Sequence, residues 1–449
     1  MSAKWRRVLA MFFCVGFLAH VAAQKNPSLV DWATQSVVYE VNLRQYTGPG
    51  TFKAFEKSLP RLRQMGVGVL WFMPIQPISQ KDRKGSLGSY YAVSNYRSIN
   101  PEHGNLEDWL HLVQAAHKAG FKVLIDWVPN HSGADHPWLQ QHPAFYVRDP
   151  KTDTAIAQFD WTDTRKLNYA NQALRDSMRN SLLYWLKETG IDGFRFDQAH
   201  LVDSSFWQET LPILRKEKPV LLIAESEDPW VHRVGFDLSY PWKYFHTTVD
   251  IAAGKKNALA LDSIQELVLK TLTPQAGLLY FTSNHDENSW NGADHQTMPQ
   301  AIHRPFMVLS QTLERSVPLV YSGQEEPLLR PLPFFEKDSI LFQQLARSKD
   351  YQSLARLRQL HPALHYLSPQ AKWVTGKDQQ VYAFVRSKAK DRVLVLANLS
   401  AQSCTLQAQQ MPPGFAPHER LTEWFSGQKT SPSALAQTTL SPWEVRIFY

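Results

Sequence analysis

The chain has very little cysteine: its 449 residues include only Cys14 and Cys404. Neither belongs to a CxxC motif, and no cluster of His and Cys has the spacing of a zinc site. Cys14 lies in an N-terminal segment that we expect to be removed, which leaves one cysteine and excludes an internal disulfide. A large apolar core must therefore stabilise the fold, and 43% of the residues are hydrophobic.

Long apolar runs are also scarce. The run at residues 8–18 is shorter than the roughly 20 residues of a membrane-spanning helix. Basic residues precede it, and the small residues Val21-Ala22-Ala23 stand before Gln24, which is the pattern of a cleaved signal peptide. The sequence therefore predicts a signal peptide over residues 1–23, an exported protein in the periplasm or the medium, and a mature chain without a membrane span.

Blocks of Lys or Arg are absent as well. Removal of the three basic residues of the signal lowers the net charge from +7 to +4, and the remaining charge is spread along the chain. Proteins that bind nucleic acids concentrate positive charge on one face or in one stretch. We therefore expect no nucleic-acid partner.

Apolar runs that indicate strands alternate with helical patterns along most of the chain. The predicted strands are 37–42, 67–75, 122–128, 193–197, 220–225, 234–238, 277–283 and 317–321. The predicted helices are 52–65, 106–119, 172–188, 205–216, 261–272, 300–314 and 350–359. A closed (β/α)8 barrel takes about 250 residues plus insertions. The alternation therefore predicts the α/β class and a TIM barrel.

Two stretches depart from this alternation. Residues 132–167 are irregular and rich in Pro and His, and they are too long for an ordinary connection, so we predict a short insertion after the third strand. After about residue 372 the apolar runs, such as 392–398, lose helical spacing. We predict a catalytic barrel over residues 24–371 and a C-terminal antiparallel β-sandwich domain over residues 372–449.

Four acidic residues stand where predicted strands end: Asp126, Asp197, Glu225 and Asp286. Their spacing follows the barrel repeat of roughly 30 residues, with one repeat between Asp197 and Glu225 and two between Glu225 and Asp286. The carboxyl ends of barrel strands meet at one face, which holds the active site in this fold. Any one acid alone could be an ordinary salt-bridge partner, but four in register predict a shared site.

Acids in this arrangement suit glycosidic chemistry, in which one carboxylate attacks and a second acid protonates the leaving oxygen. Arg195 lies two residues from Asp197 and faces the same way, which predicts that Asp197 is ionised and acts as the nucleophile. Glu225 follows the apolar run 221–224, which should raise its pKa and suit an acid/base.

Other side chains near predicted strand ends could contact a sugar. Asp286, together with His131 and His285, could hold sugar hydroxyls and favour a distorted ring. Aromatic rings can serve as flat platforms for a sugar, and Trp290 follows the Asp286 segment closely. For any single ring a place in the core is the commoner role.

The four strand-end segments resemble the four sequence blocks of the α-amylase family, glycoside hydrolase family 13. The matching segments are Asp126 to His131, Gly193 to Asp197, Ile223 to Glu225, and Asn284-His285-Asp286. Residues 88–104 are similar to the family's loop after the second strand, and residues 317–325 to its eighth strand. The resemblance covers about residues 35–449, with order and spacing in agreement.

The resemblance implies a retaining hydrolase of α-1,4-glucosidic bonds in starch or maltooligosaccharides. Asp197 would be the nucleophile, Glu225 the acid/base and Asp286 the stabiliser of the transition state, with the first two carboxyl groups about 5–5.5 Å apart. The residues that would bind the substrate are Tyr91, Asp126, His131, Arg195, His200 and His285. His200 and Leu201 depart from the Lys-His pair that is frequent there, so contacts to the leaving-group sugars are not implied.

No cofactor is required for this chemistry, and calcium is the one metal that the resemblance suggests. Asn130 matches a frequent calcium ligand of the family, and Asp160 or Asp163 could assist it. Asn130 could equally bind the backbone of its own loop. The first loop after a strand, residues 46–51, has no acids, so we expect no calcium site there.

Two other functions stay open. A transglycosidase, or an enzyme that acts on sucrose or trehalose, would use the same fold and the same residues. A non-catalytic glucan-binding accessory protein belongs to another class, but it would be expected to lose the nucleophile or the acid, and Asp197 and Glu225 are both present. The residues do not set endo or exo cleavage, tolerance of α-1,6 branches, chain-length preference or oligomeric state.

Overall fold

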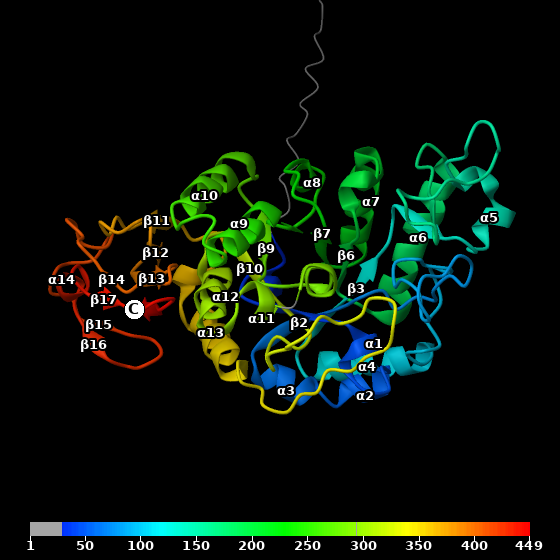
Figure 1. Ribbon diagram of the computed structural model, residues 1–449. Coiled ribbons are helices and arrows are strands. Elements are labelled where there is room, and N and C mark those ends of the chain that lie inside the picture. Colours follow the sequence, from blue (N-terminus) through cyan, green and yellow to red (C-terminus); the bar gives the residue numbers. More distant parts are fainter. Residues whose placement is uncertain (1–28, 293) are drawn as a thin grey trace, which may run out of the picture.

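The centre of the structure is a closed barrel of parallel strands (Figure 1). The computed structural model describes residues 29–292 and 294–449, so the predicted signal peptide lies outside the described residues. The barrel strands are β1 (Val37–Val41), β2 (Val67–Phe72), β3 (Lys122–Trp127), β6 (Gly193–Phe196), β7 (Leu221–Ala224), β8 (Leu238–Ser239), β9 (Gly277–Tyr280) and β10 (Ser316–Tyr321). They pair in the order β1-β10-β9-β8-β7-β6-β3-β2, which confirms the predicted TIM barrel.

Helices surround the barrel, mostly where the sequence pattern predicts them. They include α4 (Leu106–Lys118), α6 (Gln172–Thr189), α7 (Ser204–Glu217), α10 (Ala260–Thr271), α12 (His303–Thr312) and α13 (Ser348–Leu360). The single helix predicted at residues 52–65 is wrong, because α2 (Phe52–Glu56) and α3 (Leu59–Gln64) are separate. Pro60 accounts for the break, since it has no N–H to donate to the carbonyl of Glu56.

The sixth barrel strand lies later than predicted. The predicted segment is 234–238, whereas β8 is Leu238–Ser239. A short helix, α8 (Trp230–Arg233), precedes it, and Gly235 turns the chain at a φ of 115°. An unpredicted helix, α9 (Trp242–Ala252), follows β8. A strand of two residues is too short for an apolar pattern to place it.

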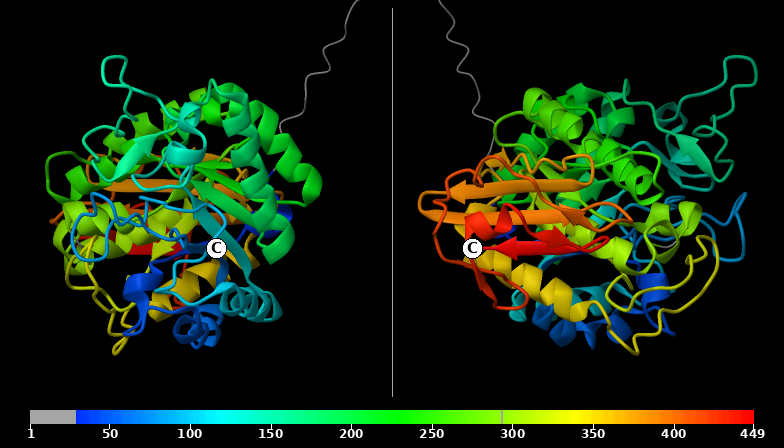
Figure 2. Two further views of the ribbon diagram at one scale, coloured as in Figure 1. Left: turned by 90° about the vertical axis from the view of Figure 1, so that its right-hand side faces the viewer. Right: turned by 60° about the vertical axis from the view of Figure 1, so that its left-hand side comes forward.

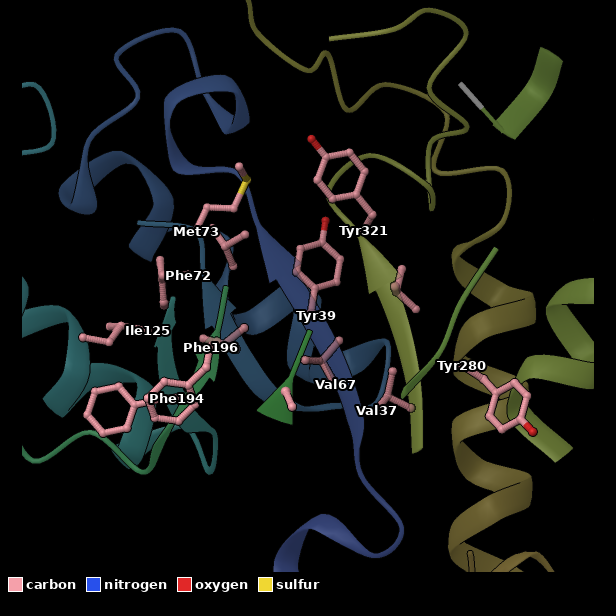
Figure 3. Packing of buried hydrophobic residues seen from close by; sticks show 14 of the residues in the cluster. Val37, Tyr39, Val67, Phe72, Met73, Ile125, Phe194, Phe196, Tyr280 and Tyr321 are labelled. Atoms are coloured by element: carbon pink, nitrogen blue, oxygen red, sulfur yellow. The ribbon is translucent and has the colours of Figure 1, made fainter. Parts of the chain in front are cut away.

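Side chains alternate between the two faces of each barrel strand. Outward-facing residues pack in the large cluster beneath the helices, and Figure 3 shows Phe72, Ile125 and Phe194 among them. On β3 the neighbouring Leu124 belongs to a second cluster, inside the barrel. Asp126 is two residues further on, so it points inward at the carboxyl end of the strand, where it is fully buried. This alternation is what brings polar groups onto the barrel's open face.

The C-terminal residues form an antiparallel sheet beside the barrel (Figure 2). Its strands are β11 (Gln370–Lys372), β12 (Val381–Lys388), β13 (Asp391–Asn398) and β18 (Val445–Phe448), and the ribbons are β14 (Cys404–Thr405) with β17 (Thr439–Leu440) and β15 (Leu421–Thr422) with β16 (Lys429–Thr430). Tyr382 and Phe384 pack with the barrel's outer cluster, while Val381 and Ala383 pack with Cys404. The predicted antiparallel domain is confirmed, with ribbons in place of a second full sheet.

Two irregular segments rise beside the carboxyl ends of the strands. The insertion after β3 holds a ribbon of β4 (His131–Gly133) and β5 (Thr164–Lys166), with α5 (Trp138–Gln141) between them. The segment after β10, residues 322–347, is yellow in Figure 1 and lies against α1 (Leu43–Tyr46), where Ile340 N–H donates to the carbonyl of Gln45 at 2.8 Å. Within the described residues no helix has the length and apolar character needed to cross a membrane.

Candidate functional site

A buried guanidinium holds the acidic groups of the open barrel face together. Arg195 is fully buried, and its Nη1 lies 3.0 Å from Asp126 Oδ1 and 3.1 Å from Asp197 Oδ1. Its Nη2 lies 2.9 Å from Glu225 Oε2. One cation therefore contacts carboxylates from β3 and from the ends of β6 and β7. The structure brings together these sequence-predicted residues, which lie up to about a hundred positions apart in the chain.

The local geometry of β6 depends on a glycine. Gly193 has a φ of 153°, and a Cβ there would lie 2.0 Å from the carbonyl oxygen of Leu221 on β7. Only glycine fits so close to the neighbouring strand. Because Arg195 and Asp197 follow at alternate positions, their side chains point to the same side, into the barrel mouth.

The two carboxyl groups beside Arg195 differ in their preference for a proton. Burial, reinforced by the negative charge of Glu225, raises the pKa of Asp197 well above its ordinary value. Burial acts the same way on Glu225, but the Arg195 guanidinium and the Gln198 backbone N–H, 2.8 Å from Oε2, outweigh it and hold the pKa of Glu225 below its ordinary value. The predicted order was the reverse and is wrong for this geometry, because Arg195 also reaches Glu225.

A further acid, Glu40, which the sequence analysis missed, lies beneath the site. Glu40 on β1 is fully buried, and its Oε1 accepts a hydrogen bond from His285 Nδ1 at 2.5 Å. Burial opposes protonation of His285, but the charges of Asp286 and Glu40 and this hydrogen bond raise the pKa of His285 to about 9. His285 is therefore an imidazolium at neutral pH, with an N–H on each ring nitrogen.

A chain of hydrogen bonds connects this imidazolium to Arg195. His285 Nε2 donates to the Tyr91 hydroxyl at 2.7 Å, and that hydroxyl donates to Asp126 Oδ2 at 3.2 Å. Asp126 in turn accepts from Arg195. Burial raises the pKa of Asp126 to about 6 despite that partner. Buried polar networks with their members paired hold side chains in one geometry, so the mouth of the barrel is preorganised.

A cavity of about 340 Å³ opens above these groups. That volume is at the lower end of the range for small-molecule sites, about 300–1,000 Å³. The lining residues include Lys84, Ser89, Tyr91, His131, Asp160, Trp161, Asp163, Asp197, Gln198, His285, Asp286, Trp290, Phe334 and Phe335. The lining is thus partly acidic and partly aromatic, a combination that suits a neutral polyhydroxylated ligand with flat apolar faces.

His131 and His200 lie in different surroundings. His131 is buried, and burial lowers its pKa to about 4, so it lines the cavity as a neutral imidazole. His200 is exposed and lies in a separate groove with Trp230 and Arg233, where its Nδ1 is 3.4 Å from the carbonyl oxygen of Glu225. The structure therefore places His200 beyond Glu225 and outside the main cavity.

The surroundings of Asn130 give a calcium ion few ligands. Asn130 is buried with its Nδ2 3.4 Å from His131 Nδ1, and Asp163 lies 3.8 Å from the Lys84 ammonium. Across residues 29–292 and 294–449 no group of three or more His, Cys, Asp or Glu side chains could hold a metal ion. Calcium prefers six to eight oxygen ligands, of which Asn130 and Asp163 would supply one or two each, and the proposed reaction does not depend on the ion.

Two features of the site were not predicted from sequence. Glu40 sits inside the apolar run Val37–Val41, and a charged residue within such a run is a signal that could have been used. Phe334 lines the cavity from the segment after β10, with its ring stacked on that of Tyr91 at a centroid distance of 6.2 Å. That segment has no periodic pattern, so nothing in the sequence indicated that it reaches the site.

Family models match most of the chain. The model described as "Alpha amylase, catalytic domain" matches residues 33–331, and the model described as "Maltogenic Amylase, C-terminal domain" matches residues 373–447. The first of these spans the barrel with all of the strand-end residues described above. The second spans the C-terminal domain apart from β11 and the last two residues.

Individual proteins are similar over most or part of the chain. "Alpha-amylase MalA" of Haloarcula japonica is 25% identical over 86% of this chain and 59% of its own length. "Trehalose synthase" of Pimelobacter sp. is 31% identical over 37% of this chain and 34% of its own length. The chain thus spans less than two thirds of the length of either relative. An α-amylase structure from Lactobacillus plantarum has a TM-score of 0.81 and 26% identity, covering 93% of this chain and 99% of that one.

Proposed function

Because the chain belongs to the α-amylase family, we propose that it is a retaining glycoside hydrolase that cleaves α-1,4-glucosidic bonds of starch or maltooligosaccharides. One observation supports this above all others. Asp197 and Glu225, at the ends of two neighbouring strands, both contact the buried Arg195, and Asp197 and Asp286 line the cavity beside it. That is the set of groups that hydrolysis with a covalent intermediate needs.

The reaction has two steps at the anomeric carbon. In the first, the Asp197 carboxylate attacks C1 while Glu225 gives its proton to the departing glycosidic oxygen, and a glycosyl ester of Asp197 forms. In the second, Glu225 takes a proton from water as that water attacks C1, and the Asp197 carboxylate departs. Each step inverts the configuration at C1, so the product keeps the configuration of the substrate.

The proton must be on Glu225 when Asp197 attacks. Asp197 and Glu225 both contact Arg195, and the charge of Glu225 raises the pKa of Asp197, so their titration belongs to the pair. A glycosidic oxygen beside Glu225 can accept a hydrogen bond only from the protonated acid, so a bound substrate favours that form. Arg195 Nη1, 3.1 Å from Asp197 Oδ1, then stabilises the nucleophile as a carboxylate.

The remaining groups orient the sugar. The Tyr91 ring lies stacked on the His285 ring, at a centroid distance of 5.4 Å, and both line the cavity. Asp286 and the neutral His131 also line it and are free to bond with hydroxyls of the sugar. As positive charge develops at C1, the carboxylate of Asp286 stabilises it electrostatically.

Product analysis with three substrates tests the proposal. We expect the protein to convert maltoheptaose into shorter maltooligosaccharides, with the α-anomer appearing first by NMR, and to leave sucrose and trehalose largely intact. Products longer than maltoheptaose would point to the transglycosidase. Faster turnover of sucrose or trehalose than of maltoheptaose would point to an enzyme that acts on sucrose or trehalose. No turnover of any of the three substrates would favour a non-catalytic glucan-binding protein.

The Glu40–His285 pair gives the reaction a predicted alkaline limit. His285 is protonated below its pKa of about 9 and loses its charge as the pH rises through that value. In the Glu40→Gln variant the amide oxygen can still accept from Nδ1, but the negative charge is gone. The pKa of His285 should then fall by about one to three units, and the alkaline limb of the kcat/KM profile should move to lower pH by the same amount.

The control for this variant is Glu56→Gln, which removes a carboxylate 2.8 Å from the exposed His111, away from the site. Its pH profile should match that of the parent protein. The charged groups around His285 in the site are Glu40, Asp286, Asp126, Glu225 and Arg195, and only Glu40 is changed. An alkaline limb that does not move in Glu40→Gln would contradict the assignment of this limb to His285.

We also propose the setting in which the protein works. The pattern over residues 1–23 supports export to the periplasm or the medium. The partner is an α-glucan oligosaccharide or polysaccharide, with no nucleic acid involved. The carboxyl groups and Arg195 are sufficient for the chemistry, so we propose that no metal is required.

A further inference from the structure

Three loops join to form a wall along one side of the cavity, which we call the end wall: residues 84–89 after β2, 288–290 after β9 and 332–336 after β10. Leu87 N–H donates to the carbonyl of Phe335 at 3.0 Å, and Ser86 N–H donates to Glu336 Oε1 at 2.8 Å. Leu332 N–H donates to Asn288 Oδ1 at 2.8 Å. Segments more than two hundred residues apart in the chain are thus bonded edge to edge.

The contact between the first and third loops is tight. Gly85 has a φ of 61°, and a Cβ there would lie 2.6 Å from Phe335 Cβ and 2.6 Å from Glu336 Oε1. Even a methyl group would therefore need the two loops to move apart. The two loops therefore leave no gap at Gly85 through which a glucan chain could pass.

Buried groups below fix the end wall in place. Arg44 on α1 is 1% exposed and donates to the carbonyls of Gly88 at 3.0 Å, Leu87 at 3.2 Å and Phe334 at 3.4 Å. Its neighbour Gln45 donates to the carbonyl of Glu336 at 2.7 Å. Side chains from one short helix thereby bond to both long loops of the wall. The wall is a fixed part of the barrel mouth rather than a loop that has to close.

The side of the end wall that faces the cavity is aromatic. The Phe334 ring lies nearly parallel to that of Tyr91, at 18°, and Trp290 packs on Phe334 at a centroid distance of 5.2 Å. Phe334, Phe335 and Trp290 all line the cavity. A flat apolar surface of this kind fits the face or edge of a terminal sugar, and the polar residues of the end wall that line the cavity beside it are Lys84 and Ser89.

The end wall stands on the side opposite the leaving group. Glu225 follows β7, and in the closed strand order β7 is four strands from β1 in either direction. Two of the three wall loops follow β2 and β10, the neighbours of β1. The aglycone leaves on the Glu225 side, where His200 and Trp230 line a second groove. C4 of a glucosyl unit lies across the ring from C1, so its non-reducing end faces the end wall.

The insertion closes the adjoining flank. Arg165 in β5 lies 3.1 Å from Asp82, and Lys84 lies 3.8 Å from Asp163. These ion pairs tie the insertion to the loop after β2, next to the end wall. The cavity therefore has a closed end and a closed flank on the side away from Glu225.

We propose that the enzyme is chain-end specific: it binds the non-reducing terminus of an α-glucan against the end wall and releases short products from that end, in place of cutting internal bonds. This inference rests on the proposed hydrolytic function and adds the direction and the mode of attack. Phe334 and Trp290 are its specificity-determining residues, and neither takes part in the bond-breaking steps.

A pair of chromogenic maltoheptaosides tests the inference. One carries a free non-reducing terminus and the other a 4,6-ethylidene group on that terminus, with p-nitrophenol at the reducing end of both. The fragments that carry p-nitrophenol are separated by chromatography and quantified by absorbance, without a coupling α-glucosidase, because that enzyme would itself degrade the free substrate. We expect the blocked substrate to be cleaved at least about tenfold more slowly, the size of effect that a small misfitting group produces in an apolar pocket.

The outcomes separate the two proposals. Equal cleavage of the blocked and free substrates would overturn chain-end specificity and leave the hydrolytic function standing. Cleavage of neither substrate would overturn the proposed function itself. Rapid cleavage of the free substrate together with slow cleavage of the blocked substrate supports the inference.

A variant of the end wall gives an independent test. Phe334→Ala opens the wall without touching the acids, so cleavage of the blocked substrate should rise relative to the free one. Leu329→Ala is the matched control, because Leu329 lies in the same segment after β10, outside the end wall, and is 67% exposed. In this variant the ratio of blocked to free substrate cleavage should equal that of the parent protein. A Phe334→Ala variant with a parental melting temperature and an unchanged ratio would contradict the role of the wall.

Discussion

Replacement of Asp197 by Asn is expected to lower kcat by at least about 10⁴-fold, since removal of a catalytic nucleophile costs about this much or more in hydrolases that form covalent intermediates. The amide cannot form the glycosyl ester. Binding should persist, because the contacts from Tyr91, His285 and Asp286 are unchanged. Steady-state rates on maltoheptaose, with the dissociation constant measured by calorimetry, check both parts.

The stability of this variant is a useful control. Asp197 is buried, and burial with the charge of Glu225 raises its pKa, so the folded protein favours the neutral side chain. A neutral Asn should therefore leave the melting temperature near the parental value. Parental hydrolysis by a folded Asp197→Asn protein would remove Asp197 from the mechanism, whereas a lost rate together with lost folding would require Asp197→Ser as a second variant.

Glu225→Gln is expected to have the second largest effect, about 10²- to 10⁴-fold on kcat/KM for maltooligosaccharides, which is the usual contribution of a general acid. The loss should depend on the leaving group. An α-glucosyl fluoride needs no proton to depart, so its first step should fall far less than that of maltoheptaose. The ratio of the two rates, measured for the parent and the variant, isolates the proton transfer.

Added azide tests the role of Glu225 as general base in the second step, with the same Glu225→Gln variant. Azide needs no general base, so it can replace water in the second step and should raise the turnover of the fluoride by Glu225→Gln, with a glycosyl azide as product. The parent protein should show no such increase. Equal losses for the fluoride and for maltoheptaose, with no effect of azide, would contradict the acid/base role of Glu225.

The barrel and its strand-end acids could be predicted because they follow local rules. Apolar runs of ordinary length, separated by helical patterns, located seven of the barrel strands closely. The spacing of Asp197, Glu225 and Asp286 then placed these acids at one face. The two elements that were predicted incorrectly also have local causes. β8 has only two residues, Leu238–Ser239, which is too short for an apolar pattern. Pro60 divides a predicted helix whose apolar pattern continues through the break.

The individual side-chain contacts within that face could not be predicted. Arg195 was expected to stabilise Asp197, which it contacts, but its second nitrogen also reaches Glu225, and this reversed the expected order of the two pKa values. Glu40 and His285 are 245 positions apart, and Phe334 comes from a loop without any periodic pattern. A single sequence holds no information on such pairs, because each depends on how the closed barrel brings loop ends together.

The scarcity of cysteine has a practical consequence for the smaller sheet. Cys404 is the free thiol of the described residues and is 3% exposed, with its Sγ 3.2 Å from Gln380 Oε1. Burial raises the pKa of the thiol. A thiol reagent can therefore react only after the β14–β17 ribbon opens, so the labelling rate measures the local opening free energy of the C-terminal domain while the barrel stays folded. Cys404 can thus serve as a probe of the C-terminal domain, separate from the barrel.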